Sequence, residues 1–173
     1  MGSGKLLTRR GVVAALGSGV AVLSGCSAED DLGTAPMADF AAAGGGEQRV
    51  DPWGSTAPGA NASLAAYGCY WSGSGTCTGP GNCAPVGSIP AGNGRWGHAD
   101  LGGNAWEWTL DGYRTPFVET QCTDCAYVAA ATSRVLRGGA FGYSAAYLIA
   151  SYRGSNSATS RSAANGARCA RAP

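Results

Sequence analysis

Residues 96–108 have the sequence WGHADLGGNAWEW, which constrains the structure more than any other stretch of the chain. Its Gly-rich part indicates a turn that can aim backbone carbonyls inward. In an extended segment, Trp106 and Trp108 project to one side and Glu107 projects to the other. We therefore expect three consecutive residues to supply a hydrophobic anchor and a carboxylate oxygen.

Around this segment, short apolar runs bounded by turn residues predict strands. These runs cover residues 86–89, 105–110, 134–136 and 140–143. The Arg-Gly-Gly sequence at 137–139 lies beside the last run and would allow a bulge or a close passage of two backbones. The predicted strands are few and short.

Helices have little room in a chain with 29 glycines and 8 prolines. Residues 38–43 are predicted to form the last turns of a helix that ends at three glycines, 44–46, because glycine adopts the left-handed cap conformation. Residues 67–81 are rich in Gly, Ser and Thr and carry two cysteines, which predicts a surface loop held by cross-links. We expect low helix content, moderate strand content and much irregular backbone.

The N-terminal region has the pattern of an export signal. Lys5, Arg9 and Arg10 precede an apolar stretch, 11–23, that is shorter than the ~20 residues a membrane-spanning helix needs. Residues 23–26 (Leu-Ser-Gly-Cys) have the form of a lipobox, in which the cysteine receives the lipid. The alternative is a buried N-terminal helix with an incidental cysteine, and the export route, general secretory or twin-arginine, stays open.

This pattern divides the chain into three parts: a lipoprotein signal peptide at 1–25, a tether at 26–36 and one domain at 37–173. Lipidation of Cys26 predicts an exported protein anchored in the membrane of a bacterial cell envelope. The net charge is +1 and only 13% of residues are charged, so we expect no nucleic-acid partner.

The chain has seven cysteines. If Cys26 is acylated, an even number remains in a compartment that permits disulfides, and their pairing cannot be deduced from sequence. The disulfide candidates are Cys69, Cys77, Cys83, Cys122, Cys125 and Cys169. Three structural disulfides are the main interpretation. The alternatives are a zinc site formed by Cys77, Cys83, Cys122 and Cys125, and a redox pair at Cys122 and Cys125.

Seven motifs occur in an order that resembles the formylglycine-generating (sulfatase-modifying factor) family, over residues 32–173. The central one is the Gly-x-x-Asp…Gly-Asn-x-Trp-Glu-Trp segment within 96–108. The others are Pro-Trp-Gly at 52–54, Pro-Val-Gly-Ser at 85–88, Asp111 with Tyr113, RVLRGGAF at 134–141, Tyr-Arg-Gly at 152–154 and Gly-Ala-Arg-Cys at 166–169.

The resemblance implies an α+β fold with low regular content, of the C-type-lectin-like sort, truncated at its N-terminal side. It also implies calcium, held by the side chains of Asp100 and Glu107 and by the carbonyls of Gly103 and Ala105. The competing interpretation is that Asp100 and Glu107 cap turns or pair with Arg137. The other calcium loop of the family is eroded, because Ala66 stands where the pattern has asparagine.

The family's chemistry depends on two cysteines that bind copper(I), a soft ion that prefers sulfur ligands. Counted from 137–139, these positions fall on Leu148 and Arg153. Neither side chain can bind copper, so copper is not expected and no catalytic residue is assigned. His98, the only histidine, is interpreted as a loop residue rather than a general acid or base.

These observations favour a non-catalytic, calcium-stabilised binding module over an enzyme. Its partner would be a peptide, a protein or a glycan, and residues 143–161, rich in Tyr, Ser, Asn and Arg, have the composition of an adaptable binding loop. One alternative is a copper-dependent formylglycine-generating oxidase with unconventional ligands. Another is a structural remnant with no separate activity, because a truncated domain buries little core.

Overall fold

The computed structural model describes residues 40–73, 76–77, 80–115, 127 and 131–168. Its one sheet has four strands in the order β3-β2-β1-β4. These are β1 (Trp106–Gly112), β2 (Ser133–Arg137), β3 (Gly154–Ser157) and β4 (Asn165–Gly166). The rest of the described chain consists of irregular segments, a helical turn at residues 40–42 and four short 3-10 helices, which are η1 (Gly45–Glu47), η2 (Pro80–Asn82), η3 (Pro90–Gly92) and η4 (Ala145–Tyr147).

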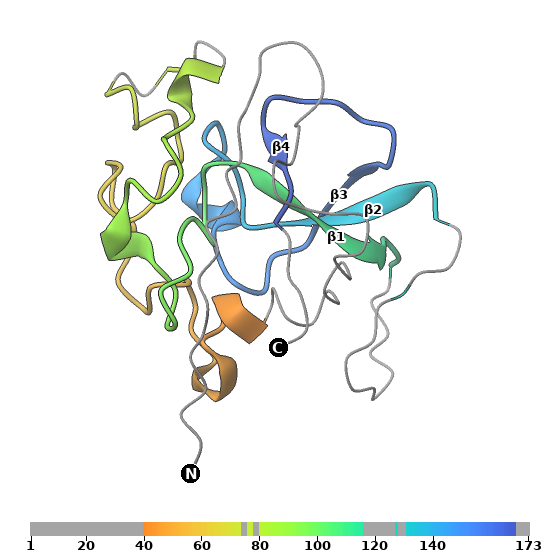
Figure 1. The fold of residues 1–173 in the computed structure, drawn as a ribbon, viewed down its shortest axis with the longest axis horizontal. Coiled ribbons are helices and arrows are strands. Elements are labelled where there is room, and N and C mark those ends of the chain that lie inside the picture. Colours follow the sequence, from red (N-terminus) through yellow and green to blue (C-terminus); the bar gives the residue numbers. More distant parts are fainter. Residues whose placement is uncertain (1–39, 74–75, 78–79, 116–126, 128–130, 169–173) are drawn as a thin grey trace.

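The sheet mixes two strand directions. Strand β1 pairs antiparallel with β2, β2 pairs antiparallel with β3, and β4 pairs parallel with β1. The register between β1 and β2 shifts between Trp108 and Gly112. Figure 1 shows the segments in yellow and yellow-green lying to one side of the sheet, at the left of the view. The expected α+β fold with low regular content is confirmed.

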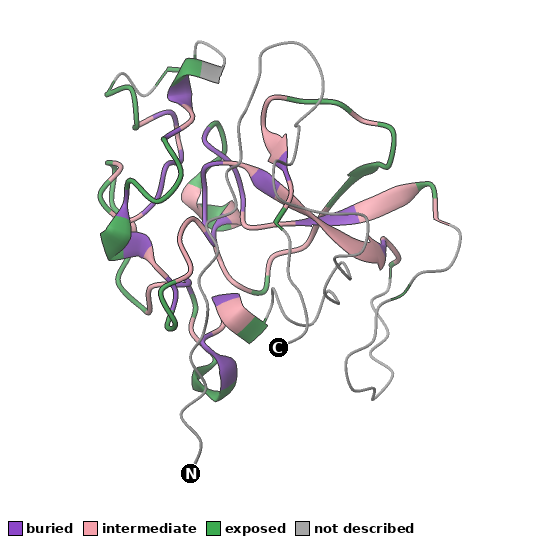
Figure 2. Cartoon of the chain, in the orientation of Figure 1, coloured by how far each residue is buried: buried purple, intermediate pink, exposed green. Residues whose placement is uncertain are grey.

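The hydrophobic core consists of small clusters rather than one large layer. Trp106, Leu136 and Ala140 form a cluster on the sheet, against which Trp108 and Tyr147 pack. Two further clusters lie among the loops, and Figure 2 shows buried residues both in the sheet and in the loops beside it. One cluster contains Ala65, Tyr67 and Leu148, and the other contains Ala66, Ala84 and Ile89. Loop residues therefore form part of the core.

Backbone hydrogen bonds between distant loops hold this core together. Gly103 donates to the carbonyl of Gly138 (2.7 Å), and Phe141 donates to the carbonyl of Asn104 (3.0 Å). A Cβ at Gly138, which has a φ of 87°, would lie 2.9 Å from the carbonyl oxygen of Leu101. The predicted close passage of backbone at residues 137–139 is confirmed, and glycine is required because a side chain would fill that space.

Two of the four predicted strands are present. Strands β1 and β2 coincide with the runs 105–110 and 134–136 within one or two residues. The runs 86–89 and 140–143 are turns, so those two predictions are wrong. Gly87 is in the left-handed region (φ 74°) between two prolines, and Gly138 and Gly139 are also left-handed, which ends β2 before residue 140. Within these two runs Ile89, Ala140 and Phe141 are buried in loops, whereas Val86 and Tyr143 are exposed.

The predicted helix end near 38–43 is partly visible, because residues 40–42 are helical and residues 38–39 lie outside the described residues. Gly44 and Gly45 follow with φ of 67° and 68°, as expected for a glycine cap. No helix in the described ranges is long and apolar enough to cross a membrane. The predicted signal peptide, tether and Cys26 lie outside those ranges.

Candidate functional site

Strand β1 separates its side chains as the sequence predicts. Trp106 is 5% exposed in the cluster on the sheet, and Trp108 packs against the same cluster. Glu107 points away from them, into a shallow pocket beside Gly138. The tryptophans are thus core residues, and the carboxylate of Glu107 lies on the opposite side of β1 and is available for polar interactions.

The carboxylate of Glu107 forms a two-pronged ion pair with Arg168. The Arg168 Nε atom donates to both oxygens of Glu107 at 3.0 Å, and Nη2 donates to Oε1 at 2.6 Å. Strand β4 makes this possible, because Gly166 is the register partner of Glu107. Arg168 lies two residues beyond Gly166, just past the end of β4.

The same guanidinium reaches two backbone carbonyls in the turn. Arg168 Nη2 lies 2.8 Å from the oxygen of Ala99 and 3.3 Å from that of Asp100. Burial works to lower the pKa of Arg168, but the charge of Glu107 and its hydrogen bonds outweigh burial and raise it. The guanidinium stays charged among oxygen atoms that would otherwise be free to accept a cation.

The side chain of Asp100 has a different partner. Its Oδ2 atom accepts a hydrogen bond from the backbone N–H of Gly87 at 2.7 Å, and Asp100 itself is left-handed (φ 55°). Asp100 thus caps the turn at residues 85–88. Turn capping is the competing interpretation that the sequence offered for Asp100. The ion pair of Glu107 described above is with Arg168.

The expected calcium ligands do not fit calcium in this arrangement. Both oxygens of Glu107 accept from Arg168, and a carboxylate oxygen of Asp100 accepts from Gly87. Gly103 and Ala105 belong to the same turn, where backbone bonds to loops 64–66 and 137–141 fix the chain. Within the described residues, no three His, Cys, Asp or Glu side chains gather as a metal site.

His98 lies beside this ion pair. Burial lowers the pKa of the imidazole, and the positive charge of Arg168 lowers it further, while Glu107 has the opposite effect. The His98 Nδ1 atom is buried and has no hydrogen-bond partner among the residues that the structure describes. The ring is therefore neutral near pH 7 and lies within the electrostatic reach of both charged groups.

Asn104 is a structural residue that sequence reasoning missed. It is left-handed (φ 64°), and its side chain spans to Ala84, accepting from the N–H at 3.0 Å and donating to the carbonyl at 3.1 Å. Its own N–H donates to the carbonyl of Ala66. An asparagine after two glycines was the available signal, since asparagine tolerates this conformation and can bond backbone from its side chain.

The two positions where the resemblance predicts the family's copper ligands, Leu148 and Arg153, hold side chains of another kind. Leu148 is 1% exposed and packs in the cluster with Ala65 and Tyr67. The guanidinium carbon of Arg153 lies 5.6 Å from the ring centre of Tyr113. Neither the apolar side chain nor the cation can bind copper(I), so the residues at these positions do not fit the metal.

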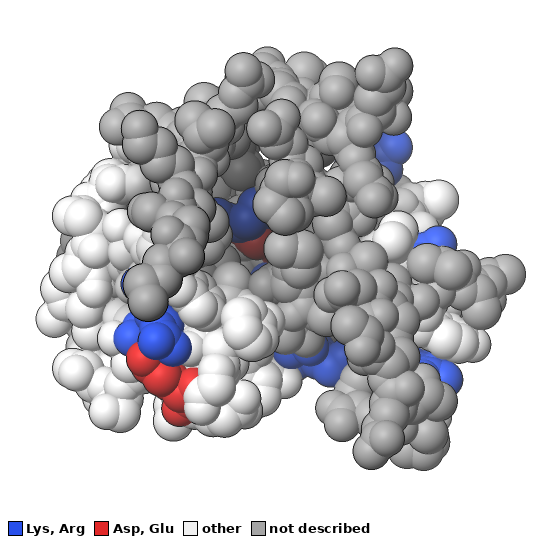
Figure 3. Space-filling model, turned by 60° about the horizontal axis from the view of Figure 1, so that its bottom comes forward, with Lys and Arg blue, Asp and Glu red and all other residues white. Residues whose placement is uncertain are grey.

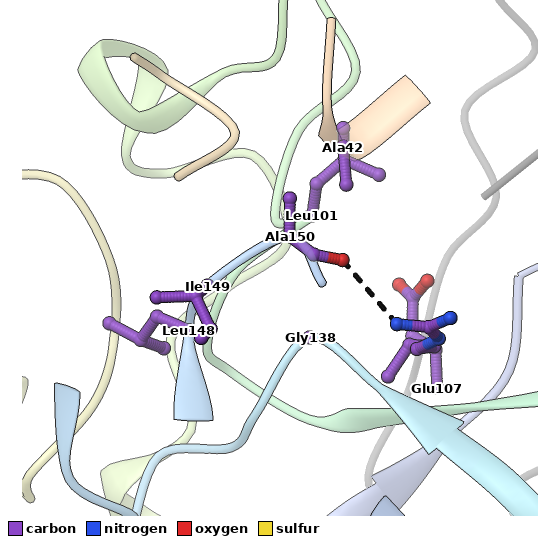
Figure 4. Close-up of a pocket in the computed structure, with 8 residues that line it drawn as sticks. Ala42, Leu101, Glu107, Gly138, Leu148, Ile149 and Ala150 are labelled. Carbon is purple, nitrogen blue, oxygen red and sulfur yellow. Dashed lines mark hydrogen bonds between the residues drawn. The ribbon is translucent and has the colours of Figure 1, made fainter. Parts of the chain in front are cut away.

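A shallow pocket lies next to the buried leucine. Figure 4 shows Leu148 and Ile149 opposite Glu107, with a hydrogen bond from Arg137 to the carbonyl of Ala150 (3.4 Å). Arg137 also donates to the carbonyl of Tyr152 at 2.8 Å. The pocket is lined by Ala42, Leu101, Glu107, Arg137, Gly138, Leu148, Ile149 and Ala150.

Four aromatic rings form a connected cluster beside this region. Trp106 contacts Tyr143, Tyr147 and Tyr152 with ring centres 5.3–5.9 Å apart, mostly edge to face. Tyr147 in turn contacts Tyr143 and Tyr152. Tyr143 is 41% exposed, so the cluster runs from the core to the surface within the predicted binding loop 143–161.

The cysteines only partly follow the prediction. Cys69 and Cys77 form a disulfide, which confirms the cross-linked loop. Among the described cysteines Cys83 carries a free thiol, and burial raises the pKa of that thiol. Its neighbour Ala84 is held by Asn104, which fixes the backbone there. Cys122, Cys125 and Cys169 lie outside the described residues, as do the zinc and redox alternatives that need them.

Charged side chains are sparse on the surface. In Figure 3, acidic and basic side chains touch in a patch at the lower left, and they meet again in a hollow near the centre of the view. Among the described residues, Glu47 pairs with Arg49 (2.6 Å) and with Arg95 (3.1 Å). Oppositely charged groups offset one another, as the net charge of +1 suggested.

Comparison with known proteins gives a consistent result. The model of the sulfatase-modifying factor enzyme 1-like domain matches residues 28–173. A hercynine oxygenase from Mycolicibacterium thermoresistibile is 35% identical over 115 residues, which cover 62% of this chain and 23% of that protein. The chain therefore spans about a quarter of the length of that curated relative.

Two solved structures share the fold. PvdO from Pseudomonas aeruginosa superposes with a TM-score of 0.64 at 18% identity, over 79% of this chain and 50% of that one. Treponema denticola variable protein 1 has a TM-score of 0.61 at 28% identity, over 79% of this chain and 45% of that one. Much of each neighbour has no counterpart here.

Proposed function

Because the chain belongs to the sulfatase-modifying factor enzyme 1-like family, we propose that it is an exported lipoprotein whose domain binds a partner and does not oxidise a cysteine. The main support for this proposal is that a fully buried leucine and an arginine occupy the positions where the resemblance predicts the family's copper-binding cysteines. Leu148 is part of the core, so a small rearrangement would not expose a metal ligand there.

The proposed binding face is the aromatic cluster and the loop that carries it. Tyr143 is exposed, Tyr147 and Tyr152 are half-buried behind it, and Trp106 anchors all three to the sheet. Tyrosine offers a large rigid contact area with a polar tip, which suits peptide, protein and glycan partners. Arg153 adds a cation stacked on Tyr113 at the edge of the same region.

Export and anchoring are the second half of this proposal. The lipobox ending at Cys26 would place a lipid at the N-terminus and hold the domain on a membrane of the cell envelope. Intact mass of the protein purified from membranes, before and after thiol labelling, measures lipidation and the number of free thiols together. If the mass shows no acyl chains on the new N-terminal cysteine, the proposed lipid anchor is wrong.

The decisive experiment separates binding from oxidation. The full-length chain is titrated with copper(I) against a chromogenic chelator, and is incubated under air with a sulfatase-derived cysteine peptide. We expect no tight binding of copper(I) and no conversion of the peptide cysteine to an aldehyde. Aldehyde formation refutes the non-catalytic assignment and favours the oxidase alternative, consistent with the name of the hercynine oxygenase relative.

Binding is measured on an array of envelope glycans and on a peptide library. Tyr143→Ala is expected to weaken any signal at least tenfold. Phe40→Ala is the matched control, because Phe40 is also exposed (58%) but stacks on Trp96, away from the cluster. Equal losses in both variants, or no ligand in either collection, count against the proposed face.

A further inference from the structure

We propose that the guanidinium of Arg168 is a resident cation, which closes the oxygen-lined turn at residues 99–107 and takes the place of a bound metal ion. The turn presents a carboxylate and two backbone carbonyls to one point. In this chain a side chain reaches that point, so the domain would not depend on calcium there.

The distances describe a filled cation position. Arg168 Nη2 lies 2.6 Å from Glu107 Oε1, 2.8 Å from the carbonyl oxygen of Ala99 and 3.3 Å from that of Asp100. Arg168 Nε binds both oxygens of Glu107 at 3.0 Å. Four oxygen atoms from two parts of the turn thus meet one guanidinium, whose planar fork matches a carboxylate.

Burial distinguishes this ion pair from an ordinary surface contact. The Glu107 side chain is 16% exposed and that of Arg168 is 33% exposed. Neither charge is fully solvated, so loss of one partner would leave the other without compensation. The pairing of Glu107 with Gly166 also fixes the position from which Arg168 starts, which lowers the entropy cost of the contact.

Charge balance explains why the guanidinium and a metal ion exclude one another. Arg168 pairs with the carboxylate of Glu107, and the charge of Asp100 also acts on the guanidinium. Calcium usually takes six to eight oxygen ligands, with several carboxylates among them. To bind, it would have to expel Arg168, and it would compete with the N–H of Gly87 for the Oδ2 atom of Asp100.

The test compares the thermal unfolding of the full-length wild type, Arg168→Ala and Arg95→Ala, each in EDTA and in millimolar calcium chloride. Arg95 is the matched control, since it also pairs with a carboxylate, that of Glu47 (3.1 Å), and donates to a carbonyl, that of Gly44 (3.0 Å). Circular dichroism reports unfolding without relying on tryptophan.

We expect the wild-type Tm to be the same with and without calcium. Arg168→Ala should lower Tm in EDTA by on the order of 5 °C, and calcium should restore part of that loss. The double variant Glu107→Gln, Arg168→Ala should lose the calcium response, and Arg95→Ala should show neither effect. These results together support a cation position that Arg168 fills.

Two results overturn the proposal. One is a rise in wild-type Tm with calcium that disappears in Glu107→Gln, since a metal would then bind beside the guanidinium. The other is an Arg168→Ala variant with unchanged Tm and no response to calcium. If Arg168→Ala does not fold, Arg168→Lys retains one charge, and its calcium-dependent Tm decides by the same criteria.

Discussion

Replacement of Asn104 by alanine should be among the most destabilising single changes in this domain. Asn104 is 8% exposed and links two loops that are far apart in sequence. Its amide accepts from the N–H of Ala84 and donates to the carbonyl of the same residue, and Ala84 is itself buried (6%). Without the amide, one buried donor and one buried acceptor lose these partners.

The size of the effect follows from these two losses and from the backbone. Each buried polar group without a partner costs about 1–3 kcal/mol. Alanine at a φ of 64° adds about 1–2 kcal/mol of strain. Partial relaxation and hydration reduce the sum, and we expect a loss of roughly 3–5 kcal/mol, against a typical total of about 5–15 kcal/mol.

Urea unfolding of the full-length chain, followed by tryptophan fluorescence, measures this loss. Asn104→Gly separates the two causes, because glycine accepts the left-handed conformation but makes no side-chain hydrogen bond. It should be more stable than Asn104→Ala by about 1 kcal/mol. If Asn104→Ala lost less than about 1 kcal/mol, the idea that this amide holds the two loops together would be wrong.

Three further measurements test other parts of the structure. Gly92→Ala should prevent stable folding or cost several kcal/mol, because its Cβ would overlap the carbonyl of Leu64, whereas Gly46→Ala has open space and should leave the urea midpoint nearly unchanged. The NMR titration of His98, the only histidine, should give a pKa below 6.5. Because folding disfavours the protonated ring, the contribution of neutral His98 to stability is complete above pH 6.5 and is lost as pH falls. A pKa at or above 6.5 would contradict the burial of His98. Asp51 is 6% exposed, and burial raises its pKa above 3.8. The free energy of unfolding should therefore fall as pH rises from 3.8 through the pKa of the folded state, and Asp51→Asn should remove this pH dependence. A free energy of unfolding that rises over this pH range would show that the carboxylate has a favourable partner.

The family and the fold class were predictable because they depend on motifs with local meaning. The alternation in Trp106–Glu107–Trp108 places two rings in the core and a carboxylate opposite them, whatever the rest of the chain does. The Arg-Gly-Gly sequence at 137–139 similarly predicts that another backbone segment passes close by, as Leu101 does beside Gly138. Such signals survive because they follow from the geometry of a few neighbouring residues.

The remaining features depend on contacts between distant residues. Strands β3 and β4 are polar and short, without the alternation that identifies a half-buried strand, so their pairing with β2 and β1 could not be read from sequence. The partner of Glu107 lies 61 residues further along the chain. Cys83 illustrates the same limit, since counting cysteines cannot say which thiol stays free.

The parallel pairing of β4 with β1 has a consequence for the order in which the sheet assembles. Closing the loop from Glu107 to Arg168 spans 61 residues, whereas the pairing of Leu136 with Gly154 closes a much shorter loop, and the difference costs about 1 kcal/mol of chain entropy. The antiparallel strands should therefore form first, and β4 should join last. In the native protein the same strand should open first, so its amides should exchange with deuterium sooner than those of β2, and limited proteolysis should begin on the C-terminal side of the sheet.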